Sequence, residues 1–363
     1  MTKTILPVSF FFGANNKSGY YSLYNKLYNP YQKGKHIILK GGPGTGKSTL
    51  MRKVAEKFEK NGYFVERGYC SADPNSLDVV AVPELNFSIL DGTAPHIADP
   101  VMPGVNEHIV DLSVAWDKEY LRCHDAEIGE LTQKNKELHL KVADYLGVAS
   151  QIEAQSVILC SGFVDIEKAE RYAKRLCARY ISERRGEVKG NEYKRFLSGI
   201  TPDGVVVQYD SVVALSEKIV TIKDEFSVVA PYIVNYVSDY AVNMGYDVYK
   251  CYCPLFPDFK VEHIMIPQLK FAVFTENSYH LSIDECSSRV HATRFFDKEG
   301  FKRNKEKLMF HKKAKKELID EAVRKLSLAL DVHNRLEEYY IKATDFEKIN
   351  EISEKIITEA DLV

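Results

Sequence analysis

Short apolar runs alternate with a helical pattern in the first part of the chain. Residues 36–40 form one apolar run, residues 46–60 place Leu50, Val54 and Phe58 on one helical face, and strand-like runs follow at 63–69 and 85–90. Short apolar runs separated by an amphipathic helix are typical of a parallel sheet with covering helices. We therefore expect an α/β unit in which these strands lie side by side.

The next segment has the periodicity of helices instead of strands. Its apolar residues are spaced by sevens, threes and fours, which places them in one stripe on a long helix. They are Leu121, Ile128, Leu131, Leu138, Val142 and Leu146. A second, shorter stripe consists of Ile166, Ala169, Ala173 and Leu176. We expect these two helices to form a helical hairpin that packs on the sheet before it.

The whole pattern occurs twice. The sequence from Asn61-Gly62-Tyr63 to Tyr69-Cys70 returns 183 residues later as Met244-Gly245-Tyr246 to Tyr252-Cys253, and Trp116-Asp117-Lys118-Glu119 returns 180 residues later as Phe296-Asp297-Lys298-Glu299. Matches in this order across most of the chain indicate a tandem duplication. We divide the chain in the polar stretch 183–192, into a first unit of residues 1–187 and a second of residues 188–363, each a sheet with a helical extension.

Composition excludes several classes of protein. Apolar residues make up 45% and charged residues 28%, and 49 Lys and Arg against 51 Asp and Glu give a formal charge of −2. This balance does not favour nucleic acid or an anionic membrane, and the basic segment 298–325 is interpreted as a solvated helix face. No apolar run is long enough to span a membrane, the first residues do not resemble a signal peptide, and seven cysteines do not suggest a disulfide framework. We expect a cytoplasmic protein.

A phosphate-binding pattern lies in the first unit. Residues 41–48 match G-x-x-x-x-G-K-[ST] between an apolar strand and a helix, which is the Walker A context. In such a loop glycines let backbone N–H groups surround a phosphate, the lysine adds a positive charge, and the hydroxyl of the next residue binds Mg²⁺. The predicted nucleotide-binding residues are Gly41, Gly42, Pro43, Gly44, Thr45, Gly46, Lys47, Ser48 and Thr49.

A P-loop enzyme also needs a carboxylate for Mg²⁺ at the end of a neighbouring strand. Asp91 follows the run 87–90 and is the expected partner of Ser48, with Asp73 and Asp78 as competitors. We expect Lys47 and Asp91 to act in catalysis. The residue that orients the attacking water stays open, because no Glu follows Asp91, and the candidates are His96 and Glu84. Candidates for a basic side chain that reaches the phosphates are Arg171, Lys174, Arg175, Arg179, Arg184 and Arg185.

The second unit has lost this chemistry. At the spacing of 183, the loop faces residues 224–231, where every glycine is absent, Lys47 is replaced by Ala230 and Ser48 by Pro231. Asp224 and Glu225 add negative charge where a polyphosphate would lie. We expect a degenerate, catalytically dead copy of the fold.

The segments ILKGGPGTGKSTLM (38–51), CSADPNSLD (70–78) and PELNFSILDGTAPH (83–96) resemble an uncharacterised group of bacterial P-loop ATPases with tandem, nucleotide-kinase-like units. The resemblance implies ATP and Mg²⁺ as ligands, and roles for Lys47, Ser48 and Asp91 as above; similar proteins commonly carry the loop in both halves. The leading hypothesis is a Mg²⁺-dependent ATPase. Alternatives are a nucleotide or small-molecule kinase and a non-enzymatic switch that reports its nucleotide state to a protein partner through the second half or the helical extensions.

Overall fold

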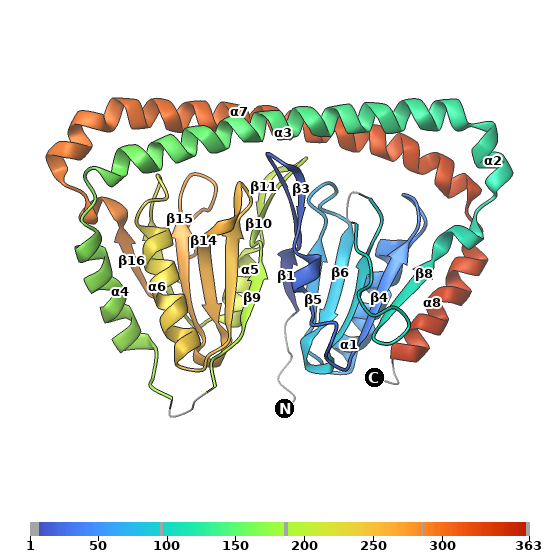
Figure 1. The fold of residues 1–363 in the computed structure, drawn as a ribbon, viewed down its shortest axis with the longest axis horizontal. Coiled ribbons are helices and arrows are strands. Elements are labelled where there is room, and N and C mark those ends of the chain that lie inside the picture. Colours follow the sequence, from blue (N-terminus) through green and yellow to red (C-terminus); the bar gives the residue numbers. More distant parts are fainter. Residues whose placement is uncertain (1–6, 95–96, 185–187, 285, 361–363) are drawn as a thin grey trace.

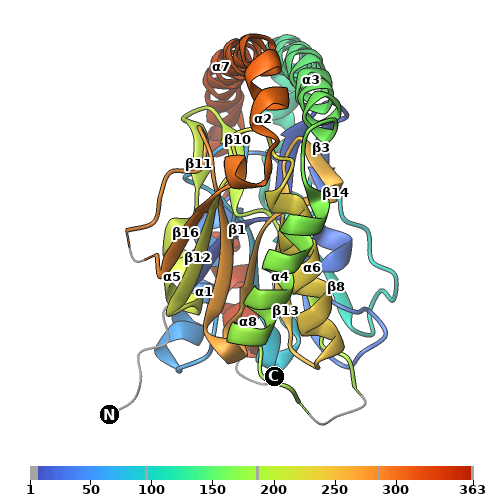
Figure 2. The same ribbon diagram turned by 90° about the vertical axis from the view of Figure 1, so that its left-hand side faces the viewer.

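The computed structural model describes residues 7–94, 97–184, 188–284 and 286–360. Two sheets stand side by side beneath two long helices that run across both of them in opposite directions (Figure 1). A view turned by 90° shows the two helices next to each other above the sheets (Figure 2). The protein is therefore an α/β structure in which the helical extensions join the two units.

The first sheet has six strands. Their order is β1 (Val8–Phe11), β5 (Glu66–Tyr69), β6 (Leu77–Val82), β7 (Phe87–Asp91), β4 (Lys35–Lys40) and β8 (Glu107–Asp111). Strand β6 is antiparallel to both neighbours, and the other pairs are parallel. The expectation of a parallel sheet is thus only partly right. The reason is the short 3₁₀ connection η2 (Pro83–Leu85) between β6 and β7, because so short a link cannot return a chain to a parallel position.

The second sheet repeats this arrangement. Its strands are β9 (Glu192–Arg195), β13 (Val248–Cys253), β14 (Phe256–Ile266), β15 (Phe271–Glu276), β12 (Lys218–Lys223) and β16 (Ser288–His291), in that spatial order. Strand β14 is the antiparallel one, as β6 is in the first sheet. The same order, with the same exception, agrees with the repeat in the sequence.

Smaller elements occur in matching places. Helices α1 (Lys47–Lys60) and α6 (Ala230–Asn243) follow the corresponding strands β4 and β12. Each sheet also carries a hairpin, formed by β2 (Gly13–Asn16) with β3 (Gly19–Ser22) and by β10 (Ser198–Thr201) with β11 (Gly204–Val207). Helix α5 (Tyr209–Leu215) packs beside β1.

The helices of the two units are exchanged. After α2 (Lys118–Cys123), helix α3 (Asp125–Ser161) leads from the first sheet to the second, where α4 (Ile166–Tyr180) packs against α6; helix α7 (Lys298–Ala343) leads back, and α8 (Phe346–Ala360) packs against α1 (Figure 1). Ala173 of α4 lies in one core with Ile233 of α6, and Ile356 of α8 in another with Leu50 of α1.

The expectation that each helical hairpin packs on its own sheet is therefore wrong. Length explains the exchange, since 37 residues of α3 span about 55 Å, whereas six strands are about 24 Å wide. The division at residue 187 separates the two sequence copies, but each compact body combines the sheet of one copy with helices of the other. Among the described helices, none has both the length and the apolar character needed to cross a bilayer.

The two sheets also meet directly. Backbone hydrogen bonds of 2.9 and 3.0 Å join Phe11 to Phe196 at the edges of the sheets. Beside them, Arg195 forms a fully buried ion pair with Glu66 at 2.7 Å, and the hydroxyl of Tyr249 donates to the same carboxylate at 2.6 Å. This contact ties the copies together at their centre.

Candidate functional site

The glycine-rich loop lies between β4 and α1, and its shape requires its glycines. Gly44 and Gly46 have φ of 69° and 82°, in the left-handed region that favours glycine. A Cβ on Gly42 would lie 2.8 Å from the ring of Tyr340, so the loop also leaves no space for a side chain there. The Thr45 hydroxyl donates to the carbonyl of Gly42 at 2.8 Å and fixes the turn.

Lys47, the first residue of α1, folds back over this loop. Its ammonium donates to the carbonyls of Gly41 and Gly42 at 2.8 and 2.6 Å, and a carboxylate oxygen of Asp91 lies 3.5 Å away. Asp91 is brought there because β7 pairs in parallel with β4, which sets Asp91 beside Leu39 at the edge where the loop begins. The ammonium is thus held at the loop with most of its side chain buried.

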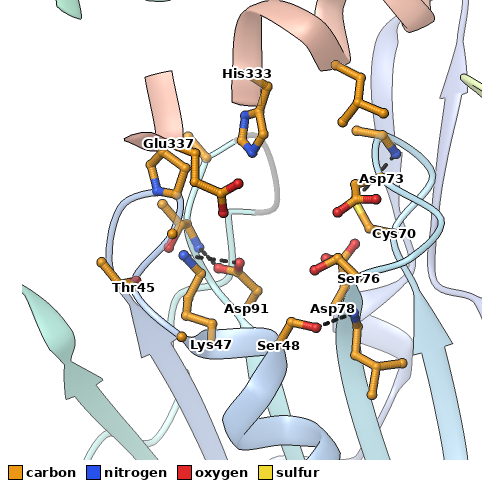
Figure 3. Close-up of a pocket in the computed structure, with 18 of the residues that line it drawn as sticks. Thr45, Lys47, Ser48, Cys70, Asp73, Ser76, Asp78, Asp91, His333 and Glu337 are labelled. Carbon is orange, nitrogen blue, oxygen red and sulfur yellow. Dashed lines mark hydrogen bonds and ion pairs between the residues drawn. The ribbon is translucent and has the colours of Figure 1, made fainter. Parts of the chain in front are cut away.

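Ser48 lies between two carboxylates. Figure 3 shows its hydroxyl at the base of the cavity, with Asp91 on one side and Asp78 on the other. The Ser48 oxygen accepts a hydrogen bond from the N–H of Leu77 at 2.9 Å, which leaves a second lone pair for another ligand. A hydroxyl and carboxylates are the hard oxygen donors that Mg²⁺ prefers, so these residues fit the ion.

A cavity of about 390 Å³ opens above the loop. Residues 43–49, the 70–78 segment and Asp91 line one side of it, and the other side consists of residues from α3 and α7. From α7 come His333, Glu337 and Ile341, which belong to the second copy; from α3 come Asn135 and His139. The site beside the intact loop is therefore built by both copies.

The structure brings most of the predicted site residues together. Pro43 to Thr49 line the cavity with Asp91, and so do the competitors Asp73 and Asp78, while Gly41 and Gly42 are contacted by Lys47. Other candidates lie elsewhere. Glu84 is exposed in η2, at the start of β7 and hence at the opposite edge of the sheet. The basic residues of α4 lie beside the second sheet and do not line the cavity, nor does Arg184, which donates to the carbonyl of Gly245. His96 and Arg185 fall outside the described residues.

Sequence reasoning missed the residues of α7. Glu337 and His333 lie far from the loop along the chain, and no motif marks them. One signal was available, because a helix of the 46 residues in α7 spans about 69 Å and cannot stay over a single six-stranded sheet. Its second half must therefore cover something other than its own unit.

The loop of the second copy holds a carboxylate of its own. One oxygen of Asp224 accepts hydrogen bonds from the N–H groups of Val228, Val229 and Ala230 at 2.9, 2.7 and 2.9 Å, and the other accepts from Phe226 at 3.2 Å. The first three donors match positions 45–47 of the intact loop at the spacing of 183. Burial raises the pKa of Asp224 above its ordinary value, while these N–H groups oppose the rise. Asp224 therefore accepts hydrogen bonds from the N–H groups that correspond to those of the intact loop.

The rest of the second site is filled by ionic side chains. Lys260 pairs with Glu153 and, at 3.0 Å, with Glu262, and Lys315 pairs with Glu153 at 3.2 Å, leaving a cavity of about 40 Å³. Glu262 also lies close to two buried histidines, a cluster of potential metal ligands. The two lysines already balance the two glutamates, however, and Nδ1 of His263 accepts an N–H hydrogen bond at 3.1 Å, so a neutral ring carries its proton on Nε2. The lysines and glutamates here form an internal ion-pair network.

Comparisons of the chain with models of protein families, with curated proteins and with solved structures found no match. The class of protein that the site indicates is therefore inferred from its residues and geometry. A glycine-rich loop at a helix N-terminus, with a lysine, a serine and carboxylates around one cavity, is an arrangement suited to a nucleoside triphosphate.

Proposed function

We propose that the first copy binds a nucleoside triphosphate with Mg²⁺ and hydrolyses it. The observation that carries this proposal is that Lys47, Ser48 and Asp91 meet beside the loop in one cavity. Its volume of about 390 Å³ falls in the range of about 300–1,000 Å³ that is usual for small-molecule sites. ATP is the nucleotide that the resemblance implies, and no base-reading motif supports another.

Each group has a defined task in this proposal. Backbone N–H groups at the start of α1 bind the phosphates, assisted by the helix dipole. Lys47 exchanges its loop carbonyls for phosphate oxygens, to which it brings a full positive charge. Ser48 and Asp91 would hold Mg²⁺, which supplies further positive charge to the phosphate oxygens. Helix α7 covers the loop and reduces access of bulk water.

Thermal unfolding and phosphate release on the same samples test the proposal. Mg-ATP at about 100 times its dissociation constant adds about 2.7 kcal/mol to the folded state, so the wild-type melting temperature should rise. Lys47→Ala should abolish both this rise and the release of phosphate. Lys53→Ala is the matched control, because Lys53 is an exposed lysine of the same helix.

The outcomes separate the hypotheses. Stabilisation of wild type with phosphate release that Lys47→Ala lacks supports hydrolysis. Stabilisation without release favours a kinase or a switch. If neither ATP nor GTP changes the melt, the proposed nucleotide site is wrong.

A phosphotransferase is the second candidate, and the shape of the cavity favours it. The cavity continues beyond Lys47 and Ser48 to Asn135 and His139 of α3 and to Leu330 of α7. That extension offers space for an acceptor next to the phosphates. Transfer to an added acceptor at a rate well above phosphate release would support this reading over hydrolysis.

A further inference from the structure

Helix α7 is pressed against the glycine-rich loop. A Cβ on Gly44 would lie 2.7 Å from side-chain atoms of both Glu337 and Ile341 and 3.1 Å from the backbone oxygen of Glu337. At Gly42, the ring of Tyr340 is similarly close. Helix α7 of the second copy therefore contacts the loop at two points. These contacts fix the position of the α7 side chains that line the cavity.

Glu337 presents its carboxylate to that cavity. Figure 3 shows it facing inward above Asp91, on the same side of the cavity as Lys47. Among the described residues of α3 and α7 that line the cavity, Glu337 is the acidic one. It approaches from the helices, whereas Asp91 and Asp78 belong to the sheet.

Asp91, the carboxylate that contacts Lys47, already has partners. Asp91 faces the Lys47 ammonium at 3.5 Å and accepts a hydrogen bond from the N–H of Thr93 at 2.8 Å. Hydrolysis is faster when a further group orients a water molecule and accepts its proton, and a carboxylate is well suited to this task. The residues after Asp91, Gly92 and Thr93, do not supply one.

The two copies differ at this position. The residue that corresponds to Glu337 at the spacing of 180 is Val157, in the part of α3 that lies over the second unit. A carboxylate thus stands over the loop that has its glycines and lysine, and an apolar side chain stands at the matching place over the loop that lacks them. A purely structural role in packing the helices would not require this difference.

We propose that Glu337, supplied by the second copy, orients the attacking water and accepts its proton. The water oxygen bonds to the γ-phosphorus as the bond from that phosphorus to the β–γ bridging oxygen breaks, and one proton of the water passes to the carboxylate. The nucleoside diphosphate and orthophosphate leave, and Glu337 returns the proton to solvent. This inference rests on the proposed hydrolysis and gives the second copy a part in it.

The test compares Glu337→Gln with Glu338→Gln, its exposed neighbour. Loss of a general base slows a reaction by about 10²–10⁴-fold, so we expect Glu337→Gln to release phosphate at least about 100-fold more slowly. Its melting temperature should still rise with Mg-ATP as in wild type. Glu338→Gln should match wild type in both measurements, and Glu337→Asp should retain part of the rate.

Binding of Mg-ADP with aluminium fluoride gives a readout that is independent of turnover. The fluoride complex imitates the transferring phosphoryl group with its attacking water, so wild type should be stabilised more by this complex than by Mg-ADP alone. Glu337→Gln should lose that difference while its stabilisation by Mg-ADP is unchanged.

Three results would overturn the role of Glu337. If Glu337→Gln releases phosphate within about threefold of the wild-type rate, Glu337 is not the general base, and the proposal of hydrolysis is unaffected. Loss of the Mg-ATP melting shift in Glu337→Gln indicates a part in binding instead. Absence of phosphate release from wild type above the level of Lys47→Ala refutes hydrolysis itself, and with it the role of Glu337.

Discussion

Substitution of Asp224 tests quantitatively how far its carboxylate stabilises the loop of the second copy. Replacement of this residue by alanine removes a buried carboxylate that accepts hydrogen bonds from Phe226, Val228, Val229 and Ala230. Three of these donors share one oxygen at the start of α6, where backbone N–H groups have no partner within the helix. The expected result is a less stable second unit.

The magnitude follows from those donors. A buried donor without a partner costs about 1–3 kcal/mol, so three donors at the lower end give a loss of about 3 kcal/mol for Asp224→Ala. Asp224→Asn keeps an acceptor oxygen in place but removes its charge, and hydrogen bonds to charged groups are the stronger ones. We therefore expect a smaller loss for Asn than for Ala.

Urea unfolding measures this loss, with Asp331→Ala, an exposed aspartate of the same copy, as the control. The experiment is then repeated with sulfate at constant ionic strength. Because Asp224→Ala leaves a group of inward N–H donors at a helix N-terminus, sulfate should raise its unfolding midpoint more than that of wild type. A variant that unfolds like wild type would show that the carboxylate does not hold the loop, and equal responses to sulfate would show that the donors do not form an anion site.

Two further predictions concern buried ion pairs. Glu66→Ala leaves Arg195 buried without its partner, and breaking such a pair costs about 3–5 kcal/mol; an unfolding free energy within about 1 kcal/mol of wild type would contradict this. Burial alone would raise the pKa of Glu153, but Lys260 and Lys315 outweigh it and lower the pKa to about 2. The contribution of ionised Glu153 to the free energy of unfolding is therefore complete above its unfolded pKa of about 4.3. This contribution is lost as pH falls towards 2. The advantage of wild type over Glu153→Gln, measured by urea unfolding, should shrink across that range and not above it.

Local features of the fold could be predicted from the sequence, and distant ones could not. The strand, loop and helix around Lys47 follow one another directly, so spacing was enough to expect them, and Asp91 lies beside them because its strand pairs with that of the loop. The antiparallel strand β6 was missed because no strand was expected between the runs 63–69 and 85–90, although Leu77–Val82 forms one.

The part of the site that α7 provides could not be predicted from the sequence. Glu337 meets the loop only because the helical extensions cross between the units, and periodicity describes which face of a helix is apolar without saying what that face covers. For the second loop, the loss of phosphate binding stays a prediction from the missing glycines and lysine. The sequence did not reveal that Asp224 turns back onto the N–H groups, because that contact depends on the backbone path of a loop with no motif.

The crossing of helices between the copies has a consequence for how the two halves could diverge. Two identical chains that exchange helices form a symmetric dimer in which every substitution occurs in both sites. Once both copies lie on one polypeptide, each position can change independently, and the two members of the pair are always present in equal amounts. The second loop could then lose its glycines and lysine while α7, the long helix of the same copy, continued to line the site of the first copy. One covalent chain thereby holds a stable asymmetry that a dimer of identical subunits cannot encode.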